Sequence, residues 1–484
     1  MSLTGGASIL MVGQISIKLI TFTLNQLLIR NLPASLIGLN QSVEFLDNYF
    51  IFLSTEAVRL SINRIPNDLK NKKQQIVKFS MLPSLIYLVI VLPLNYYYYH
   101  TLSDHLSIFQ LVLVNLSIFI QIINEPLYNI NQFHDFNFSK RVKFESCALL
   151  LKSGLQYLLL TFTSLSFVDT LIYSRLAYST CLLVLYLSSI GLPKFDSLKA
   201  IIDLSYFKSI YLQLIFKNFL TQGDQIIINS TLGLTSQGYY SIISNYGSLI
   251  VRLIFQPIEE STRISITQLF TSTSIAPQEK TQQLNESLLP LCKFYFYLIT
   301  LFQLFSYLNI KFAMSLILPR LSNIPELIKG FKLYWAAYLP LMSINGLLEA
   351  LFFSCFSDTQ SYSKLMFGNS LLFYADSLIL IKKFGILGLI MSNLVNFTVR
   401  IVYCLVRLKN QLQLKISDVV SWSYLSAYIV SLLFQYWFFQ GEVDSLKQFV
   451  VSALNGVFLC LVVVFAERTT VRNFVQRRQK LKHS

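Results

Sequence analysis

The sequence predicts an all-α polytopic membrane protein that crosses the bilayer about fourteen times. Of its 484 residues, 54% are hydrophobic and only 13% are charged, whereas soluble proteins carry roughly 25% charged residues. Apolar runs of about twenty residues recur from end to end, and a helix of that length crosses about 30 Å of hydrocarbon. The strands of a membrane barrel would be about ten residues long and strictly alternating, and the runs here have neither property.

A short charged motif indicates that the chain contains two related halves. The segment EAVRLSI, which begins at Glu56, is echoed by ESTRISI, which begins at Glu260. An offset of about 200 residues favours a duplicated half over a short solenoid repeat. In both copies Glu and Arg are three residues apart, so they share one helix face where an apolar segment ends. We interpret the motif as a charged hinge at the membrane border, present once in each half.

The apolar runs place the crossings in chain order. We expect six in the first half, at 7–30, 37–57, 75–94, 106–128, 144–163 and 171–192. Six more follow in the second half, at 207–232, 239–258, 288–308, 331–355, 365–381 and 386–406. Two further crossings are expected at 419–439 and 449–465. The connections between them are too short for a large soluble domain.

Lys and Arg gather on alternate loops, which predicts the orientation. The cations in the second loop, the fourth loop and the C-terminal tail are Arg59, Arg64, Lys70, Lys72, Lys73, Lys78, Lys140, Arg141, Lys143, Arg468, Arg472, Arg477, Arg478, Lys480 and Lys482. Because cytoplasmic loops carry the excess of positive charge, we expect these loops and both termini in the cytosol. The net charge of +15 is therefore mostly a topology signal. We expect no nucleic-acid partner, since no folded basic surface is predicted.

Motifs for enzymatic chemistry are not found. The sequence has no GxxxxGK[ST] phosphate loop, no GxSxG and no HExxH. The six cysteines occur singly in apolar segments, without a CxxC or a Cys/His cluster. We therefore expect neither an enzyme nor a bound metal or cofactor.

Ionisable residues inside the predicted crossings are the strongest functional signal. Placing a Lys, Arg or Asp at mid-membrane costs about 2.5–3.5 kcal/mol, so each needs a partner or a watery cavity. These residues are Lys18, Arg30, Glu44, Asp47, Glu145, Lys152, Lys217, Asp224, Arg252, Glu349, Asp376 and Arg400. Singly, each is compatible with an internal ion pair that fixes helix packing. As a set they favour a polar cavity, and its cations suit an anionic head group because Arg grips phosphate with two hydrogen bonds.

Several segments carry a family resemblance. They are GASILMVGQISIKLITFTLNQLLIR from Gly6, EAVR from Glu56, NEPLYNINQ from Asn124, LTQGDQ from Leu220, GYYSIISNYGSLIVRLIFQPIEES from Gly238, SINGLLEALFF from Ser343 and SNLVNFTVRI from Ser392. They resemble the eukaryotic oligosaccharide-translocation family of the endoplasmic reticulum, within the multidrug/oligosaccharidyl-lipid/polysaccharide exporter superfamily. The match spans nearly the whole chain.

The resemblance implies two six-helix lobes related by a pseudo-twofold axis, with two added C-terminal helices. We expect an N-terminal lobe at 1–200, a C-terminal lobe at 201–410, the added helices at 411–466 and a basic cytosolic tail at 467–484. It also implies translocation of a dolichol-pyrophosphate-linked oligosaccharide, Man5GlcNAc2, from the cytosolic to the lumenal leaflet for N-glycosylation. The partners are then this glycolipid, the membrane lipids and other enzymes of the pathway.

The family's charged positions fall on Lys18, Arg30, Glu56, Arg59, Lys152, Arg252, Glu259 and Glu260. We expect Lys18, Arg30, Arg59, Lys152 and Arg252 to contact the pyrophosphate and glycan. Glu56, Glu259, Glu260 and Arg263 are expected to latch a gate between the lobes. One departure is Thr55, where relatives often have Arg. The tail residues Lys480 and Lys482 resemble the dilysine signal that retrieves membrane proteins to the endoplasmic reticulum.

We expect alternating access without ATP hydrolysis, because no nucleotide motif is present. Two alternatives remain open at this stage. One is a non-transporting scaffold that presents the glycolipid to neighbouring enzymes. The other is a cation-coupled exporter of small molecules, against which the cationic lining argues.

Overall fold

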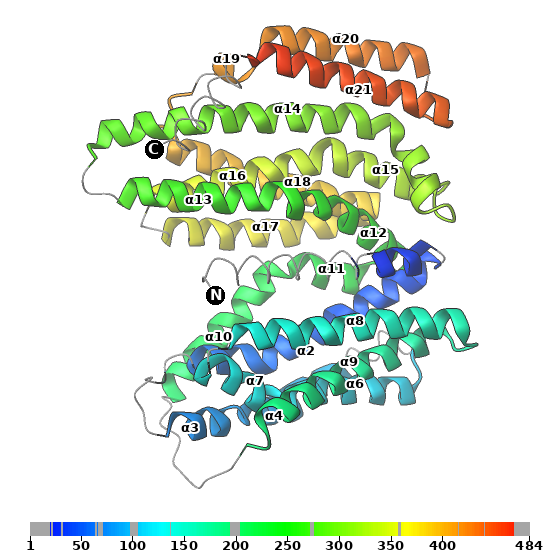
Figure 1. Cartoon of the computed structure of the whole chain (residues 1–484), viewed down its shortest axis with the longest axis vertical. Coiled ribbons are helices and arrows are strands. Elements are labelled where there is room, and N and C mark those ends of the chain that lie inside the picture. The colour runs from blue at the N-terminus through cyan, green and yellow to red at the C-terminus, as the bar shows by residue number, and fades with distance from the viewer. Residues whose placement is uncertain are drawn as a thin grey trace. The chain divides into compact units, whose positions relative to one another are not determined.

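The computed structural model describes residues 20, 23–30, 32–62, 65, 71–96, 105–135, 137–193, 204–271, 275–356, 360–414, 416–439 and 441–468. Within these residues all regular structure is helical (Figure 1). The chain forms two compact units, Met1–Gln225 and Ile226–Ser484.

The first unit is built around α2, a long helix that packs against α10, α6 and α4. Helix α9 packs against both α8 and α6. The helices of this unit are α2 (Ala34–Ile62), α3 (Lys72–Phe79), α4 (Leu82–Ile86), η1 (Tyr87–Val91), α6 (Ile108–Ile123), α7 (Glu125–Asn129), η2 (Ile130–His134), α8 (Phe138–Phe162), α9 (Phe167–Ile190) and α10 (Leu204–Thr221). Helix α11 (Gly223–Thr231) contains the boundary between the units.

The second unit packs α17 against α18 and α13 against α16, while α16 also contacts α18. The hairpin of α20 and α21 lies along α14 (Figure 1). The helices are α12 (Leu234–Ile250), η3 (Val251–Phe255), α13 (Gln256–Thr271), α14 (Pro277–Ile317), α15 (Pro325–Leu333), η4 (Tyr334–Tyr338), α16 (Leu339–Cys355), α17 (Gln360–Phe384), α18 (Ile386–Leu408), α19 (Ile416–Val419), α20 (Trp422–Phe439) and α21 (Leu446–Ala466).

Short polar residues explain where several helices begin. Ser107 forms a capping box with Gln110 at the start of α6, and Ser166 accepts a hydrogen bond from the backbone of Asp169 at the start of α9. These side chains satisfy backbone N–H groups that have no partner inside the helix. Gly385 joins α17 to α18 with φ of 57°, a left-handed conformation that favours glycine. The chain can therefore reverse its direction within a short connection, so that α17 and α18 pack closely against each other.

Three of the π-helical turns end two residues before a proline. Val91 ends η1 before Pro93, Phe255 ends η3 before Pro257, and Tyr338 ends η4 before Pro340. Proline lacks an N–H group, and its ring clashes with the carbonyl four residues earlier in an α-helix. One extra residue in the preceding turn relieves that clash, so the helix continues as a π-bulge.

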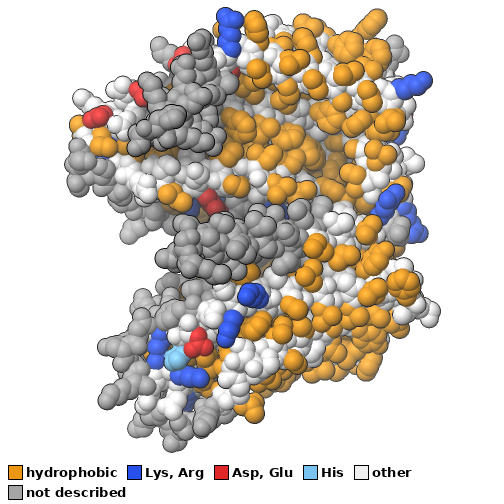
Figure 2. All heavy atoms as spheres, in the orientation of Figure 1, with side chains coloured by type: hydrophobic (Ala, Val, Ile, Leu, Met, Phe, Trp, Pro, Cys, Tyr) orange, Lys and Arg blue, Asp and Glu red, His pale blue; other side chains and the backbone are white. Residues whose placement is uncertain are grey.

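Eight helices in the described part of the chain are long and apolar enough to cross a membrane. They are Lys72–Tyr96, Ile108–His134, Phe167–Ile190, Pro277–Ile317, Pro325–Cys355, Ser361–Phe384, Ile386–Leu408 and Leu446–Ala466. Large hydrophobic side chains such as Trp437 (75% exposed) and Leu461 (64% exposed) lie on the surface of α20 and α21. Figure 2 shows hydrophobic side chains covering much of the second unit around these helices. Such a surface suits the hydrocarbon core of a bilayer.

The helices cover the ranges predicted from hydropathy, with differences in detail. The range 207–232 is divided near Gln222 into α10 and α11, and the range 419–439 becomes α20, which starts at Trp422. The predicted crossings at 37–57, 144–163, 207–232, 239–258 and 419–439 are not among these eight candidate spans. Two of them fall on α2 and α8, which carry several ionisable residues. Much of the first expected crossing, 7–30, lies outside the described residues.

Candidate functional site

Arg59 near the end of α2 forms a buried ion pair with Glu125, the first residue of α7. The Arg59 Nε donates to Glu125 Oε2 at 3.1 Å, and Nη2 contacts Oε1. The Glu125 side chain is 4% exposed and also accepts a hydrogen bond from Asn129. The guanidinium lies 4.3 Å from the ring centre of Tyr128, a distance at which cation–π attraction operates. Glu56 was predicted as part of the latch, and its Oε2 lies 3.8 Å from Arg59 Nη1.

A second charged network lies nearer the start of α2, around Glu44 and Asp47. Glu44 Oε1 accepts a hydrogen bond from Lys152 Nζ of α8 at 3.0 Å and lies 3.5 Å from Arg175 Nη2 of α9. Arg175 also pairs with Asp47, and its side chain is 4% exposed. Two carboxylates and two cations thus neutralise one another inside the first unit. Arg175 was not predicted as a site residue, although two acids on one face of α2 need more positive charge than Lys152 supplies.

The second unit contains a related network around Glu349 of α16. Glu349 Oε1 accepts hydrogen bonds from Arg400 of α18, Tyr362 of α17 and Asn345 one turn earlier. The sequence analysis named Glu349 and Arg400 only as separate intramembrane charges. Their pairing joins two segments that carry the family resemblance, SINGLLEALFF and SNLVNFTVRI.

Glu259 approaches this network from α13. Its carboxylate occupies the space beside Gly346, where a Cβ atom would lie 2.1 Å from Oε1. Glu259 forms no ion pair with a described residue, and it is half-buried. Glu260, the next residue, is exposed and accepts a hydrogen bond from Gln256 at 3.3 Å. Of the two neighbouring glutamates of α13 that were predicted as latch residues, only Glu259 therefore reaches α16.

The repeated E-x-x-R motif has a structural counterpart in each unit. Arg263 lies over the ring of Phe353 at 5.7 Å, as Arg59 lies over Tyr128. Phe353 follows Glu349 by four residues, and Tyr128 follows Glu125 by three. The ion pairs differ, however, because Arg59 binds Glu125 whereas Glu349 is held by Arg400. Arg263 is exposed and forms no ion pair with a described residue.

Arg252 has a different environment from Arg59 and Lys152. It lies in the π-helical turn η3 and is exposed, and within the described part of the chain it donates only to the backbone and hydroxyl oxygens of Ser248, at 3.3 and 3.2 Å. No carboxylate of the described residues pairs with it. Arg30 is exposed as well, at the end of the described part of the first crossing. Lys18, Lys480 and Lys482 lie outside the described residues.

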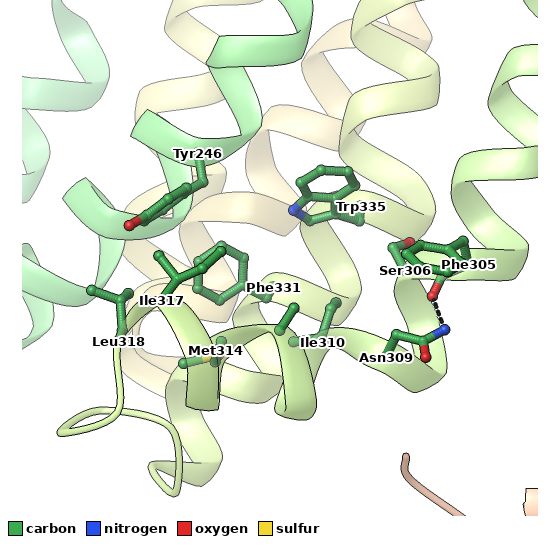
Figure 3. A pocket seen from close by; sticks show the side chains of 11 residues that line it. Tyr246, Phe305, Ser306, Asn309, Ile310, Met314, Ile317, Leu318, Phe331 and Trp335 are labelled. Atoms are coloured by element: carbon green, nitrogen blue, oxygen red, sulfur yellow. Dashed lines mark hydrogen bonds between the residues drawn. The ribbon is translucent and has the colours of Figure 1, made fainter. Parts of the chain in front are cut away.

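An apolar cavity of about 150 Å³ lies within the second unit. Tyr246 of α12, Met314 of α14, Phe331 of α15 and Trp335 of η4 line it (Figure 3). Its other lining residues are Phe305, Ser306, Asn309, Ile310, Ala313, Ile317 and Leu318. No charged residue lines this cavity, so an anionic head group finds no partner there.

The fold defines the class of protein. It is similar to the lipid II flippase MurJ in an inward closed conformation, with a TM-score of 0.62 over 94% of this chain and 100% of that chain, at 14% identity. It is also similar to a multidrug transporter of the MATE family in an inward-facing conformation, with a TM-score of 0.55 over 81% and 94% of the two chains, at 13% identity. The chain thus shares the helical fold of these polytopic membrane proteins.

Sequence comparison then identifies the family. The chain belongs to the Rft protein family, whose sequence pattern matches residues 2–477. It is 30% identical to the Man(5)GlcNAc(2)-PP-dolichol translocation protein RFT1 of Saccharomyces cerevisiae, over 98% of this chain and 95% of that protein. The protein of the same name from Candida albicans is 31% identical over 96% and 93%. The mouse protein is 26% identical over 80% and 78%. The predicted family resemblance is confirmed.

Proposed function

We propose that the chain moves Man5GlcNAc2-PP-dolichol from the cytosolic to the lumenal leaflet of the endoplasmic reticulum membrane, where the glycan serves protein N-glycosylation. The observation that carries this proposal is family membership along nearly the whole chain, with relatives named for this translocation. A flippase-like fold with eight candidate membrane spans suits a substrate with an isoprenoid tail. The proposal includes fourteen crossings, two pseudo-symmetric lobes and cytosolic termini.

Arg252 is the first ligand that we assign to the pyrophosphate. It is a cation in a crossing, exposed, and without a carboxylate partner among the described residues. A guanidinium can hold two phosphate oxygens at once, which compensates the charge of the head group. We assign Arg30 to the pyrophosphate as well, because its side chain is exposed like that of Arg252. Lys18 is included because of its position in the first predicted crossing.

Arg59 and Lys152 are proposed to bind the substrate by exchanging one anionic partner for another. Each already has a carboxylate partner, Glu125 and Glu44 respectively. We assign them a role in which the diphosphate competes with these carboxylates during the cycle. Exchange of partners keeps every cation compensated in both states, so neither state binds the substrate too tightly for release. Glu56, Glu259, Glu260 and Arg263 remain our proposed latch, and Glu259 has the clearest structural basis because it fits against Gly346.

The decisive experiment is leaflet exchange in liposomes with the authentic glycolipid. We expect the wild-type protein to raise exchange above the protein-free rate and Arg252→Ala to lower it at least tenfold, because one charge-assisted contact contributes at least about 1.4 kcal/mol. Arg407→Ala is the matched control, since Arg407 is an exposed cation at the end of α18 outside the proposed site. Glycolipid binding with exchange at the protein-free rate would instead favour the scaffold alternative.

A further inference from the structure

Asp376 lies inside α17 and takes no part in the networks described above. Helix α17 is a candidate membrane span, and Asp376 is eight residues, or about 12 Å, from its end at Phe384. The residue as a whole is half-buried, but both carboxyl oxygens are shielded from solvent, and neither forms a hydrogen bond of regular geometry with a described residue. None of the ion pairs in the described part of the chain includes this residue.

The packing of α17 on α18 explains why water does not reach the carboxyl group. Leu380, one turn after Asp376 on the same face, lies so close to Gly388 that a Cβ atom at 388 would be 2.2 Å from the Leu380 carbonyl oxygen. Ser392, one turn after Gly388 on α18, is fully buried and faces Asp376. The two helices therefore close tightly around the carboxyl group.

The Ser392 hydroxyl group can accept a hydrogen bond from the protonated form of Asp376. The same hydroxyl group donates to the carbonyl oxygen of Gly388 at 3.1 Å. An ionised carboxylate accepts hydrogen bonds only, whereas a protonated carboxyl group has one O–H to donate. The available partner thus fits the protonated form.

The charged residues on the two helices offer no counter-ion. Arg400 lies eight residues beyond Ser392 on α18, about 12 Å along the axis, and is paired with Glu349. Arg407 lies further towards the same end, over Phe356. The lysines of α17 are exposed: Lys364 lies twelve residues before Asp376, and Lys382 and Lys383 lie in the last turn. A carboxylate buried in a membrane span without a counter-ion becomes neutral by binding a proton.

We propose that Asp376 is a proton-binding site whose loading and release accompany the conformational cycle of the carrier. Water supplies the proton to the carboxylate oxygen, and the resulting O–H donates to Ser392 while α17 and α18 are packed. A conformation that separates the two helices hydrates the group and favours its ionised form, which returns the proton to water. This inference rests on the proposed translocation and adds a proton gradient as its source of energy.

Infrared spectroscopy of the full-length protein in liposomes tests the protonated carboxyl group without requiring transport. We expect a carboxylic-acid C=O band at neutral pH that is weaker in Asp376→Asn and unchanged in Glu279→Gln, which removes an exposed carboxyl group. Ser392→Ala should move the band to higher frequency, because a hydrogen bond to the hydroxyl oxygen is lost. Equal bands in the wild type and in Asp376→Asn would overturn the proposal.

A pH difference across the liposome tests the coupling. With one proton per glycolipid, a difference of one pH unit should shift the steady-state ratio of glycolipid between leaflets about tenfold in the wild type. Asp376→Asn, which keeps the size of the side chain, should exchange glycolipid without such a shift. The same shift in both proteins refutes coupling at Asp376. Wild-type exchange at the protein-free rate refutes the proposed function instead, and the infrared result still decides whether Asp376 binds a proton.

Discussion

Arg59 and Glu125 are 66 positions apart and meet in a two-contact ion pair that ties α2 to α7. The pair brings together EAVR and NEPLYNINQ, two of the segments that carry the family resemblance. Because Glu125 is almost fully buried, its charge depends on Arg59 for compensation. The pair therefore serves the packing of the first unit as well as any exchange with substrate.

The first prediction concerns this pair. Arg59→Ala should destabilise the protein by about 3–5 kcal/mol, because it leaves a buried carboxylate without a partner. The double variant Arg59→Met/Glu125→Leu should recover most of the loss, since no charge is then stranded. Thermal unfolding in detergent measures both, with Arg407→Ala as the control. Equal losses in the single and double variants would contradict the assignment.

A second prediction compares Lys152 and Arg175, the two cations that pair with Glu44 and Asp47 of α2. Arg175 is 4% exposed and contacts both Glu44 and Asp47, whereas Lys152 is 22% exposed and contacts Glu44 alone. Arg175→Met should therefore lower the unfolding temperature more than Lys152→Met does. The comparison is made in the same detergent and at the same pH. The reverse order would show that Lys152, not Arg175, neutralises this network.

The third prediction uses two glycines in membrane helices. An alanine at Gly388 would place its Cβ 2.2 Å from a backbone oxygen of α17, so Gly388→Ala must separate the helices and should destabilise the protein. An alanine at Gly456 of α21 meets nothing within 4 Å, and Gly456→Ala should be neutral or stabilising by up to about 1 kcal/mol. Unfolding temperatures decide the matter. Similar values for both variants would refute the close packing of α17 on α18.

The fourth prediction separates the position of Glu259 from its charge. A Cβ atom at 346 collides with the flexible end of Glu259, so Gly346→Ala should move the carboxylate while the helices stay in place. We expect normal unfolding but reduced glycolipid exchange, as in Glu259→Gln. The contrary outcome is a wild-type exchange rate in Gly346→Ala together with reduced exchange in Glu259→Gln. It would show that transport needs the charge of Glu259 but not its position against α16.

The fifth prediction concerns Arg252 in living cells. Cells in which the only copy carries Arg252→Ala, at normal protein abundance, should accumulate Man5GlcNAc2-PP-dolichol on the cytosolic side and under-glycosylate secreted proteins. Arg252→Lys should restore part of the activity, since a lysine keeps the charge but cannot make a bidentate contact. Chromatography of the lipid-linked oligosaccharides measures the accumulation. Unchanged glycosylation in Arg252→Ala would remove Arg252 from the site.

Much of the fold could be read from local patterns. Apolar runs near twenty residues predict the helices, because the bilayer requires that length and an internally bonded backbone. The prolines at 93, 257 and 340 mark the places where helices change to a π-helical turn, although the turns themselves were not predicted. The same reading found Glu349 and Arg400 as charges that need partners, but not that they are partners of each other.

Taken by itself, the sequence determined the class of protein, its helices and its family, because hydropathy and motifs are properties of neighbouring residues. Only the tertiary structure decided which charges neutralise one another, since ion pairs such as Arg59–Glu125 and Arg175–Asp47 join residues on different helices. It separated Arg252, which has no carboxylate partner among the described residues, from Arg59 and Lys152, which do have one. It also showed that the carboxyl group of Asp376 is buried beside a serine rather than a cation, because the close approach of α17 and α18 at Gly388 leaves room for little else.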